Sequence, residues 1–307
     1  MSLEALGWNK RRQQEFQSFA CQGLLPGRVI GEHRTHFDVA VAGGELTAEI
    51  PGRLRNAATL RSDLPGVGDF VALTPSNGDG PAIIESVLPR TSAIIRQAVG
   101  ERRPQLVAAN VDIVFVVTAL DGDFSLERTL RYLTVIGEGG ARPVIVINKA
   151  DIGLGIEAAL AELRAAAPDV PVHVICAHNP ADVAQLETYF SGGQTIALLG
   201  SSGVGKSTLT NQLLKREVQA TQTVRAHDNR GRHTTTHRQL FIREAGGSIM
   251  DTPGMRGLEL WDAEPMTADD DAFEAIEALA TECKFRNCGH VSEPSCAVRA
   301  AVDRGEI

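Results

Sequence analysis

Short apolar runs broken by glycine and proline dominate the chain from residue 27 to residue 89. Five of these runs have the length and alternation of β-strands, and no stretch among them has the period of a helix. Short strands joined by Gly-rich turns are typical of a small barrel such as the OB-fold, which often binds oligonucleotides. A barrel that only packs on its neighbour fits these residues nearly as well. We expect strands at 28–30, 37–41, 46–50, 69–73 and 82–88.

The pattern changes after residue 90, where apolar runs alternate with helical segments. This order is the βαβ rhythm of a parallel sheet. Two later apolar runs each lead directly into a motif described below, so we expect the same sheet to continue through both. The predicted strands are 113–118, 144–147, 172–176, 195–199 and 248–250, and the predicted helices are 126–136 and 156–166.

The last part of the chain differs again. An acidic stretch at 269–271 precedes residues 272–281, in which Phe273, Ile276 and Leu279 have the spacing of one helical face. The expected fold is therefore multi-domain. We expect an N-terminal segment with an OB-fold barrel in residues 1–92, an α/β domain in 93–262 and a helical C-terminal domain in 263–307.

Composition sets limits on the class of protein. With 307 residues, 43% apolar and 22% charged, the chain has material for about two to three packed domains. No apolar run approaches the roughly 18 residues of a membrane span, and the basic residues 10–12 are not followed by the apolar region of a secretory signal. We expect a soluble, cytoplasmic monomer. The net charge of −8 argues against bulk attraction to nucleic acid, so any RNA contact has to be local.

The most specific motif is a Gly-rich loop between a predicted strand and a helix that begins near Thr208. Residues 200–207 read GSSGVGKS, the pattern of a P-loop. Its glycines let backbone N–H groups converge on phosphate oxygens, Lys206 adds a charge at the β- and γ-phosphates, and the Ser207 hydroxyl can bind Mg²⁺. A tight turn without ligand is the less favoured alternative. The predicted phosphate contacts are Gly200, Ser201, Ser202, Gly203, Val204, Gly205, Lys206, Ser207 and Thr208.

A second motif indicates which base is read. Residues 148–151 read NKAD and follow a predicted strand, at the end where parallel sheets bind ligands. The Asp151 carboxylate can accept two hydrogen bonds from guanine N1 and N2, whereas adenine offers no matching donors. Taken alone, these residues could equally form a turn that caps a helix. The predicted base-binding residues are Asn148, Lys149, Ala150, Asp151, Cys176 and Ala177.

The order of the motifs is unusual. Asp251 follows another strand and begins the motif DTPG, which places a carboxylate near Mg²⁺ and the Gly254 amide near the γ-phosphate. GTPases of the translation type begin with the phosphate loop, whereas here the base-reading loops come first. This order indicates a circularly permuted GTPase domain, which is tolerated when sheet neighbours keep their places. The nucleotide-sensing segment then lies directly before the tail, so we expect nucleotide state to act on the tail.

Residues 225–238 hold almost no apolar side chain and are expected to form a mobile switch loop. Thr235, or as a second choice Thr234, would complete the Mg²⁺ shell when GTP is bound. Four arginines and three histidines against one acid make this loop a candidate contact for RNA phosphate, or else a plain solvated face.

Met255 stands where many P-loop GTPases carry the glutamine that orients the attacking water. Intrinsic hydrolysis should therefore be slow. We expect His233 or His237, or a docked partner, to supply the missing function.

Three thiols and one imidazole occur within 14 residues near the C-terminus: Cys283, Cys288, His290 and Cys296. This set matches the ligand number and types of a closed structural zinc site, which leaves no position for catalysis. Because the spacing is not the commonest one, reduced buried cysteines are the alternative. Cys21 and Cys176 are interpreted as lone, inert cysteines.

Together these features resemble the RsgA (YjeQ) family of circularly permuted GTPases over nearly the whole chain. The resemblance rests on the barrel, the motifs at 148–151, 200–208, 231–235 and 251–254, and the Cys-Cys-His-Cys tail. It implies a GTPase that binds the small ribosomal subunit late in maturation, contacts its rRNA through barrel, switch loop and zinc domain, and leaves after hydrolysis. Relatives continue further beyond the last cysteine, so we expect the zinc domain here to be truncated.

Other functions fit part of the same pattern. A GTPase acting on another RNA particle, such as the large subunit or a transfer RNA, would share every nucleotide motif. A GTP-dependent RNA-binding switch with negligible intrinsic turnover would fit Met255. An ATP-specific P-loop enzyme is a weaker alternative, because the NKAD loop suits guanine.

Overall fold

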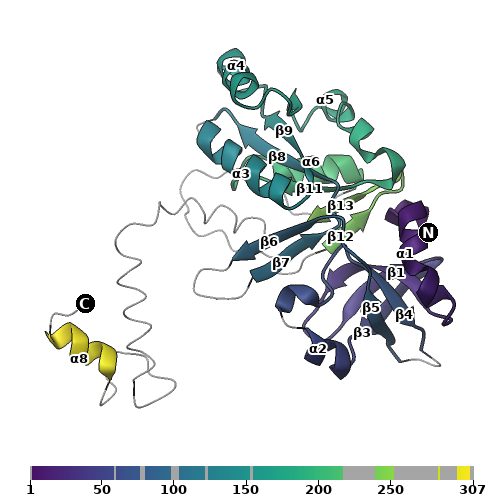
Figure 1. The fold of residues 1–307 in the computed structure, drawn as a ribbon. Helices are drawn as coiled ribbons and strands as arrows, with labels where there is room; N and C mark the ends of the chain where they lie inside the picture. The colour runs from purple at the N-terminus through teal and green to yellow at the C-terminus, as the bar shows by residue number, and fades with distance from the viewer. Residues whose placement is uncertain are drawn as a thin grey trace. The chain divides into compact units, whose positions relative to one another are not determined.

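The computed structural model describes residues 2–58, 60–76, 80–97, 104–121, 124–152, 155–216, 239–251, 283 and 296–304. The chain divides into two compact units, Met1–Leu260 and Trp261–Ile307, and the barrel and the α/β sheet both belong to the first (Figure 1). In the second unit, α8 spans Ala297–Arg304. The predicted switch loop at 225–238 and the predicted helix at 272–281 lie outside the described residues. The division into three domains stays a prediction.

The N-terminal barrel has the strands β1 Leu25–Glu32, β2 Phe37–Val41, β3 Gly44–Glu49, β4 Phe70–Thr74 and β5 Ala82–Val87. They pair in the order β1-β2-β3-β5-β4, and β4 also pairs with β1, which closes the barrel as predicted. Alternate side chains along each strand point inward, and Val29, Val39 and Val71 are fully buried there.

Helical elements that the sequence pattern did not predict surround the barrel: η1 Glu4–Leu6, α1 Lys10–Ala20, α2 Gly52–Ala57 and η2 Arg61–Asp63. Asn9 caps α1 by accepting a hydrogen bond from the Arg12 backbone N–H. Trp8 packs edge-on against Phe16 of α1 and Phe70 of β4. Helix α1 is therefore attached to the outside of the barrel by an aromatic cluster.

The α/β part has the strands β8 Ile113–Ala119, β9 Arg142–Asn148, β10 Val172–Val174, β11 Thr195–Leu199, β12 Gln239–Ile242 and β13 Ser248–Asp251. They stand in the order β10-β9-β8-β11-β13-β12. The first five are parallel, as predicted, and β12 is antiparallel to β13. Barrel and α/β strands form one 11-stranded sheet, because Gln239 of β12 pairs with Gly31 of β1.

Helices cover both faces of this sheet: α3 Leu126–Glu138, α4 Ile156–Ala166, α5 Pro180–Ala184, η3 Glu187–Gly193 and α6 Lys206–Leu214. Every residue of β8 is buried. Successive side chains of a strand point to opposite faces, so Val116 packs in one cluster with Ile136 of α3, and Val117 packs in another with Leu209 of α6. The predicted helices α3 and α4 are confirmed. Among the described residues, none of the helices is both long and apolar enough for a membrane span.

A separate antiparallel ribbon connects the two parts of the sheet. It consists of β6 Ala93–Gln97 and β7 Pro104–Ala109, and the sequence pattern predicted neither strand. It is followed by Asn110, which has a positive φ of 54° and lies just before β8.

Asn110 is the centre of a buried polar joint between the barrel and the α/β sheet. Its carboxamide oxygen accepts a hydrogen bond from Arg12 Nη2 at 2.6 Å, and its backbone oxygen accepts one from Arg28 Nη2 at 3.1 Å. Arg28 also donates to the carbonyl oxygens of Leu6 and Gly68. Both guanidinium groups are at most 2% exposed, and burial lowers the pKa of Arg28 to about 10. These contacts hold the barrel against the amino-terminal end of β8.

Candidate nucleotide-binding site

The sequence motifs meet at the carboxyl edge of the parallel strands. Asn148 is the last residue of β9, Asp251 is the last residue of β13, Gly200 directly follows β11, and Cys176 lies shortly after β10. The carboxyl ends of parallel strands share one edge, which is the ligand-binding edge of open α/β sheets. The strand before the phosphate loop comes late in the sequence but lies between β8 and β13 in the sheet. If the chain is read from β11 to β13 and then from β8 to β10, the phosphate loop comes first and the base-reading loops come last, as in other GTPases.

The phosphate loop is held tightly against the strands beneath it. Gly200 has φ +149°, and a Cβ at this position would overlap the carbonyl oxygen of Val117 in β8. The loop ends at Gly205, whose φ of +97° directs the chain into α6. Only glycine combines this backbone conformation with such close approach. The first N–H groups of α6 are thereby presented at the sheet edge, where they can bind an anion.

Asn148 joins three of the predicted motifs. Its Nδ2 donates a hydrogen bond of 2.8 Å to the carbonyl oxygen of Val204 in the phosphate loop. Its Oδ1 accepts one of 2.9 Å from the backbone N–H of Ala177. The side chain is only 3% exposed. One buried amide therefore fixes the position of the NKAD loop relative to the phosphate loop and the loop after β10.

Lys206 and Ser201 lie within the phosphate loop. The Lys206 ammonium donates to the carbonyl oxygens of Gly200 and Ser201, the latter at 2.5 Å. The Ser201 hydroxyl is buried and has no hydrogen-bond partner within the described part of the chain. Ser207 and Thr208, in the first turn of α6, are partly buried. The Lys206 ammonium therefore lies at the phosphate loop, where it can bind a polyanion.

The NKAD loop leaves its acidic residue accessible. Asp151 is exposed, and the preceding Ala150 donates its backbone N–H to the Ile175 carbonyl oxygen at 3.1 Å. Lys149 has a positive φ of 60°. These contacts hold the backbone next to Asp151, and the exposed carboxylate is accessible to a ligand.

Two acidic residues that support these loops were missed in the sequence. Asp121, just after β8, binds the Lys149 ammonium at 2.5 Å. Asp182, in the first turn of α5, accepts a 2.8 Å hydrogen bond from the backbone N–H of Cys176. Asp121 could have been found in the sequence as an acidic residue shortly after a buried parallel strand. Asp182 could have been found as an acidic residue that follows Asn-Pro at the start of a helix.

Several predicted site residues lie outside the described part of the chain: Thr235, His233, Gly254, Cys288 and His290. Asp251 is described only through its backbone in β13. Cys283 and Cys296 are described, and their sulfur atoms are 3.9 Å apart. Cys296 lies just before α8, and its sulfur accepts a hydrogen bond from the backbone N–H of Arg299 at 3.4 Å.

Comparisons with known proteins agree with this geometry. The profile of the RsgA GTPase family matches residues 87–261. "Small ribosomal subunit biogenesis GTPase RsgA" of Opitutus terrae is 44% identical, and the alignment covers 100% of this chain and 86% of that protein. "Small ribosomal subunit biogenesis GTPase RsgA 2" of Lactiplantibacillus plantarum is 42% identical over 93% of this chain and 80% of its own.

Solved structures show the same fold. YjeQ from Thermotoga maritima is 26% identical and has a TM-score of 0.59, covering 92% of this chain and 93% of its own. YloQ, described as a circularly permuted GTPase, is similar in fold, with 24% identity, a TM-score of 0.54, and coverage of 92% of this chain and 90% of its own. The chain thus belongs to the RsgA GTPase family and is a GTP hydrolase with a circularly permuted fold.

Proposed function

We propose that this GTPase assists the maturation of the small ribosomal subunit and that binding to the subunit stimulates its hydrolysis of GTP. Relatives aligned along the whole chain carry this role in their names. The structural observation that carries the proposal is the Asn148 amide, which joins the phosphate loop to the NKAD loop at one edge of the sheet. A guanine nucleotide can span these two loops at once.

In this proposal GTP lies along the sheet edge, with its phosphates in the loop of residues 200–207. Lys206, at the start of α6, would pair with the β- and γ-phosphates. Asp151 accepts hydrogen bonds from guanine N1 and N2, which distinguishes guanine from adenine. Cys176 and Ala177 line the base.

Magnesium is the metal expected at the phosphates. Ser207 at the start of α6 and Thr235 would hold it, with Asp251 nearby. When bound, Mg²⁺ neutralises charge on the β- and γ-phosphates. The Gly254 amide would contact the γ-phosphate, and His233 or a group of the docked partner would orient the attacking water.

The tail supplies a structural zinc site in this proposal. Tetrahedral zinc with Zn–S bonds of about 2.3 Å places two thiolate sulfurs about 3.8 Å apart. The 3.9 Å between the Cys283 and Cys296 sulfurs matches that separation. Cys288 and His290 would complete the site. Metal analysis of the purified protein, freed of loosely held metal, should give one zinc, and Cys296→Ser should lower that content. Unchanged zinc in this variant would contradict the assignment.

Contacts with rRNA are proposed for the barrel, the switch loop and the tail, with the protein acting as a monomer in the cytoplasm. The net charge of −8 requires these contacts to be local basic areas. Their strength should therefore fall steeply with salt.

Phosphate release from GTP tests the proposed function. It is measured for the protein alone, with small subunits and with large subunits, and ATP serves as the nucleotide control. Stimulation by small subunits only is the expected result. Stimulation by neither subunit, with GTP still preferred, would reject the ribosomal partner and favour another RNA particle. Equal hydrolysis of ATP would contradict the guanine-reading role of Asp151.

A further inference from the structure

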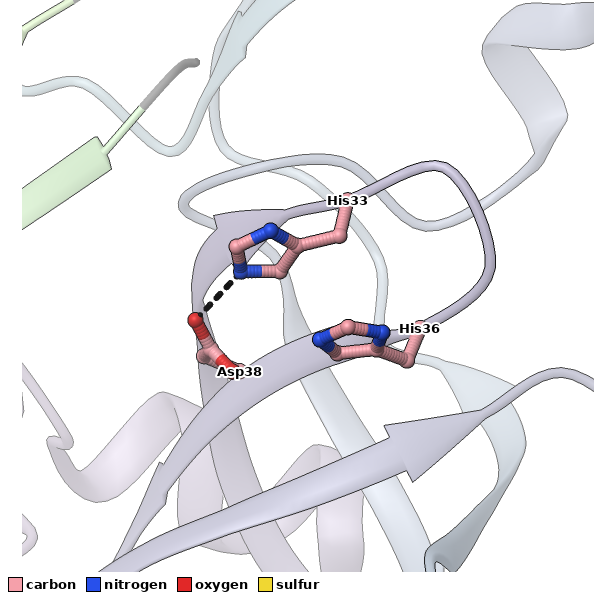
Figure 2. A group of neighbouring side chains, drawn as sticks. All are labelled: His33, His36 and Asp38. Atoms are coloured by element: carbon pink, nitrogen blue, oxygen red, sulfur yellow. Dashed lines mark hydrogen bonds and ion pairs between the residues drawn. The ribbon is translucent and has the colours of Figure 1, made fainter.

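A second group of potential ligands lies on the barrel. Residues 33–36 connect β1 to β2, and the side chains of His33, His36 and Asp38 gather on one side of this hairpin (Figure 2). The Nε2 atom of His33 and a carboxylate oxygen of Asp38 are 2.6 Å apart. One ligand atom from each residue lies within 4.8 Å of the other two, and all three residues are partly buried.

The hairpin holds these side chains in place from both ends. The backbone N–H of His33 donates to the carbonyl oxygen of His36 at 2.9 Å, and Glu32 pairs with Phe37 at the end of the ladder. The two imidazole rings stack, with centroids 4.4 Å apart and planes 18° apart. Both rings therefore present a nitrogen edge in the direction of the Asp38 carboxylate (Figure 2). The ligands are largely arranged by the turn itself.

The two nitrogens of His36 have different surroundings. Its Nδ1 lies 3.2 Å from the Thr35 hydroxyl. Metal-binding imidazoles usually have their second ring nitrogen hydrogen-bonded to a neighbouring group. In His36 the Thr35 hydroxyl, which can donate or accept, occupies Nδ1, so Nε2 is the nitrogen placed to bind an ion. It corresponds to the nitrogen that His33 directs at Asp38.

The ligand types indicate the class of ion. Two imidazoles and one carboxylate suit a divalent transition metal such as Zn²⁺ or Ni²⁺, whereas Mg²⁺ and Ca²⁺ prefer oxygen ligands. Bonds of about 2.0–2.2 Å place tetrahedral ligands about 3.4 Å apart. The three ligand atoms lie within 4.8 Å of one another, so binding would require them to move by about 1 Å. An ion would replace the His33–Asp38 hydrogen bond with bonds to all three residues.

The position of the group is also informative. Gly31 of β1 is opposite Asp38 in β2 and opposite Gln239 in β12. The hairpin therefore lies where the barrel strands meet the α/β strands. A bound ion would stiffen the barrel at this junction.

We propose that His33, His36 and Asp38 form a divalent transition-metal site on the barrel, separate from the cysteine site of the tail. The full-length protein, purified with zinc and freed of loosely held metal, is titrated with Ni²⁺ by calorimetry. The variants are His36→Ala and His33→Gln, and Arg34→Ala is the matched control, because Arg34 is an exposed neighbour in the same turn.

The wild type and Arg34→Ala should bind one more Ni²⁺ than either histidine variant, or bind it at least tenfold more tightly. Ni²⁺ should also raise the unfolding temperature of these two proteins more than that of the histidine variants. Equal stoichiometry and affinity in all four proteins would overturn the proposal. GTP binding in the absence of Ni²⁺ checks that each variant is folded. If His36→Ala fails to fold, His33→Gln is the second variant, because it keeps an amide near Asp38.

Discussion

Replacing Gly205 with alanine tests how tightly the phosphate loop and the NKAD loop are packed. Gly205 has φ +97°, and a Cβ there would overlap Asn148 Nδ2. Gly203 lies in the same loop with φ +88°, but a Cβ there would meet nothing within 4 Å. Gly203→Ala is therefore a matched control that introduces the same backbone strain without the overlap.

The expected difference follows from the contacts of Asn148. Both substitutions place alanine in the left-handed region, which costs about 1–2 kcal/mol. Only Gly205→Ala displaces the Asn148 amide, which then loses its bonds to Val204 and Ala177 of 2.8 and 2.9 Å. Each buried group left without a partner costs about 1–3 kcal/mol. We expect Gly205→Ala to destabilise the nucleotide-free protein by about 2–4 kcal/mol more than Gly203→Ala.

Urea unfolding of the two variants in the absence of nucleotide measures this difference. A further variant, Asn148→Ala, removes the side-chain amide that the Cβ of alanine at position 205 would overlap. Adding Gly205→Ala to it should cost no more than Gly203→Ala costs in the wild type. Equal losses for the two glycine variants, or full additivity with Asn148→Ala, would refute the proposed contact.

Three further predictions concern the base, the joint and pH. Asp151→Asn removes the charged acceptor proposed for guanine. Because a hydrogen bond to a charged group contributes about 1.5–3 kcal/mol, the Kd for GTP should rise about 10- to 150-fold. Competition binding measures this change, and an unchanged preference for GTP over ATP would contradict the prediction. Arg28→Met leaves the carbonyl oxygens of Leu6 and Asn110 without their Arg28 donor, while the Gly68 oxygen keeps its bond from Asn110 Nδ2. It should lower the free energy of unfolding by about 3–5 kcal/mol. A loss within the error of the urea unfolding experiment would show that the joint adds little. Burial lowers the pKa of His173, although a hydrogen bond to Gln185 raises it. The unfolded state, with a histidine pKa of about 6.5, then binds more protons than the folded state, so stability should fall as pH drops below about 6.5. His173→Asn should flatten that part of the stability profile, and an identical profile would rule out this residue as the cause.

The sequence predicted the elements whose pattern is local. Alternation in 37–41 and the apolar run at 113–117 predicted β2 and β8, and GSSGVGKS predicted the loop between β11 and α6. β12 was missed, because Gln239–Ile242 is short and follows a long polar segment. The ribbon of β6 and β7 was missed because its polar middle reads as a linker.

The contacts that fix the site depend on tertiary structure. Asn148 was predicted to bind the base, but its bond to Ala177 depends on how β9 and β10 pair. Arg12 ends a basic run that would be expected on a solvated surface, yet it is 2% exposed and paired with Asn110. The periodicity of a local sequence cannot predict that Arg12 is buried, because its hydrogen-bond partner Asn110 is distant in the chain.

The joint at Asn110 fixes the orientation of the barrel, and this matters for any partner that binds the barrel. Arg12 and Arg28 are out of water and bonded across the junction, so a pivot of the barrel would separate buried cations from their acceptors. The barrel therefore keeps one orientation relative to β8 and the strands beside it. A partner that recognises only the barrel thereby determines which way the carboxyl edge of the sheet points. Docking through the barrel surface alone would then fix which part of the partner faces the proposed nucleotide site.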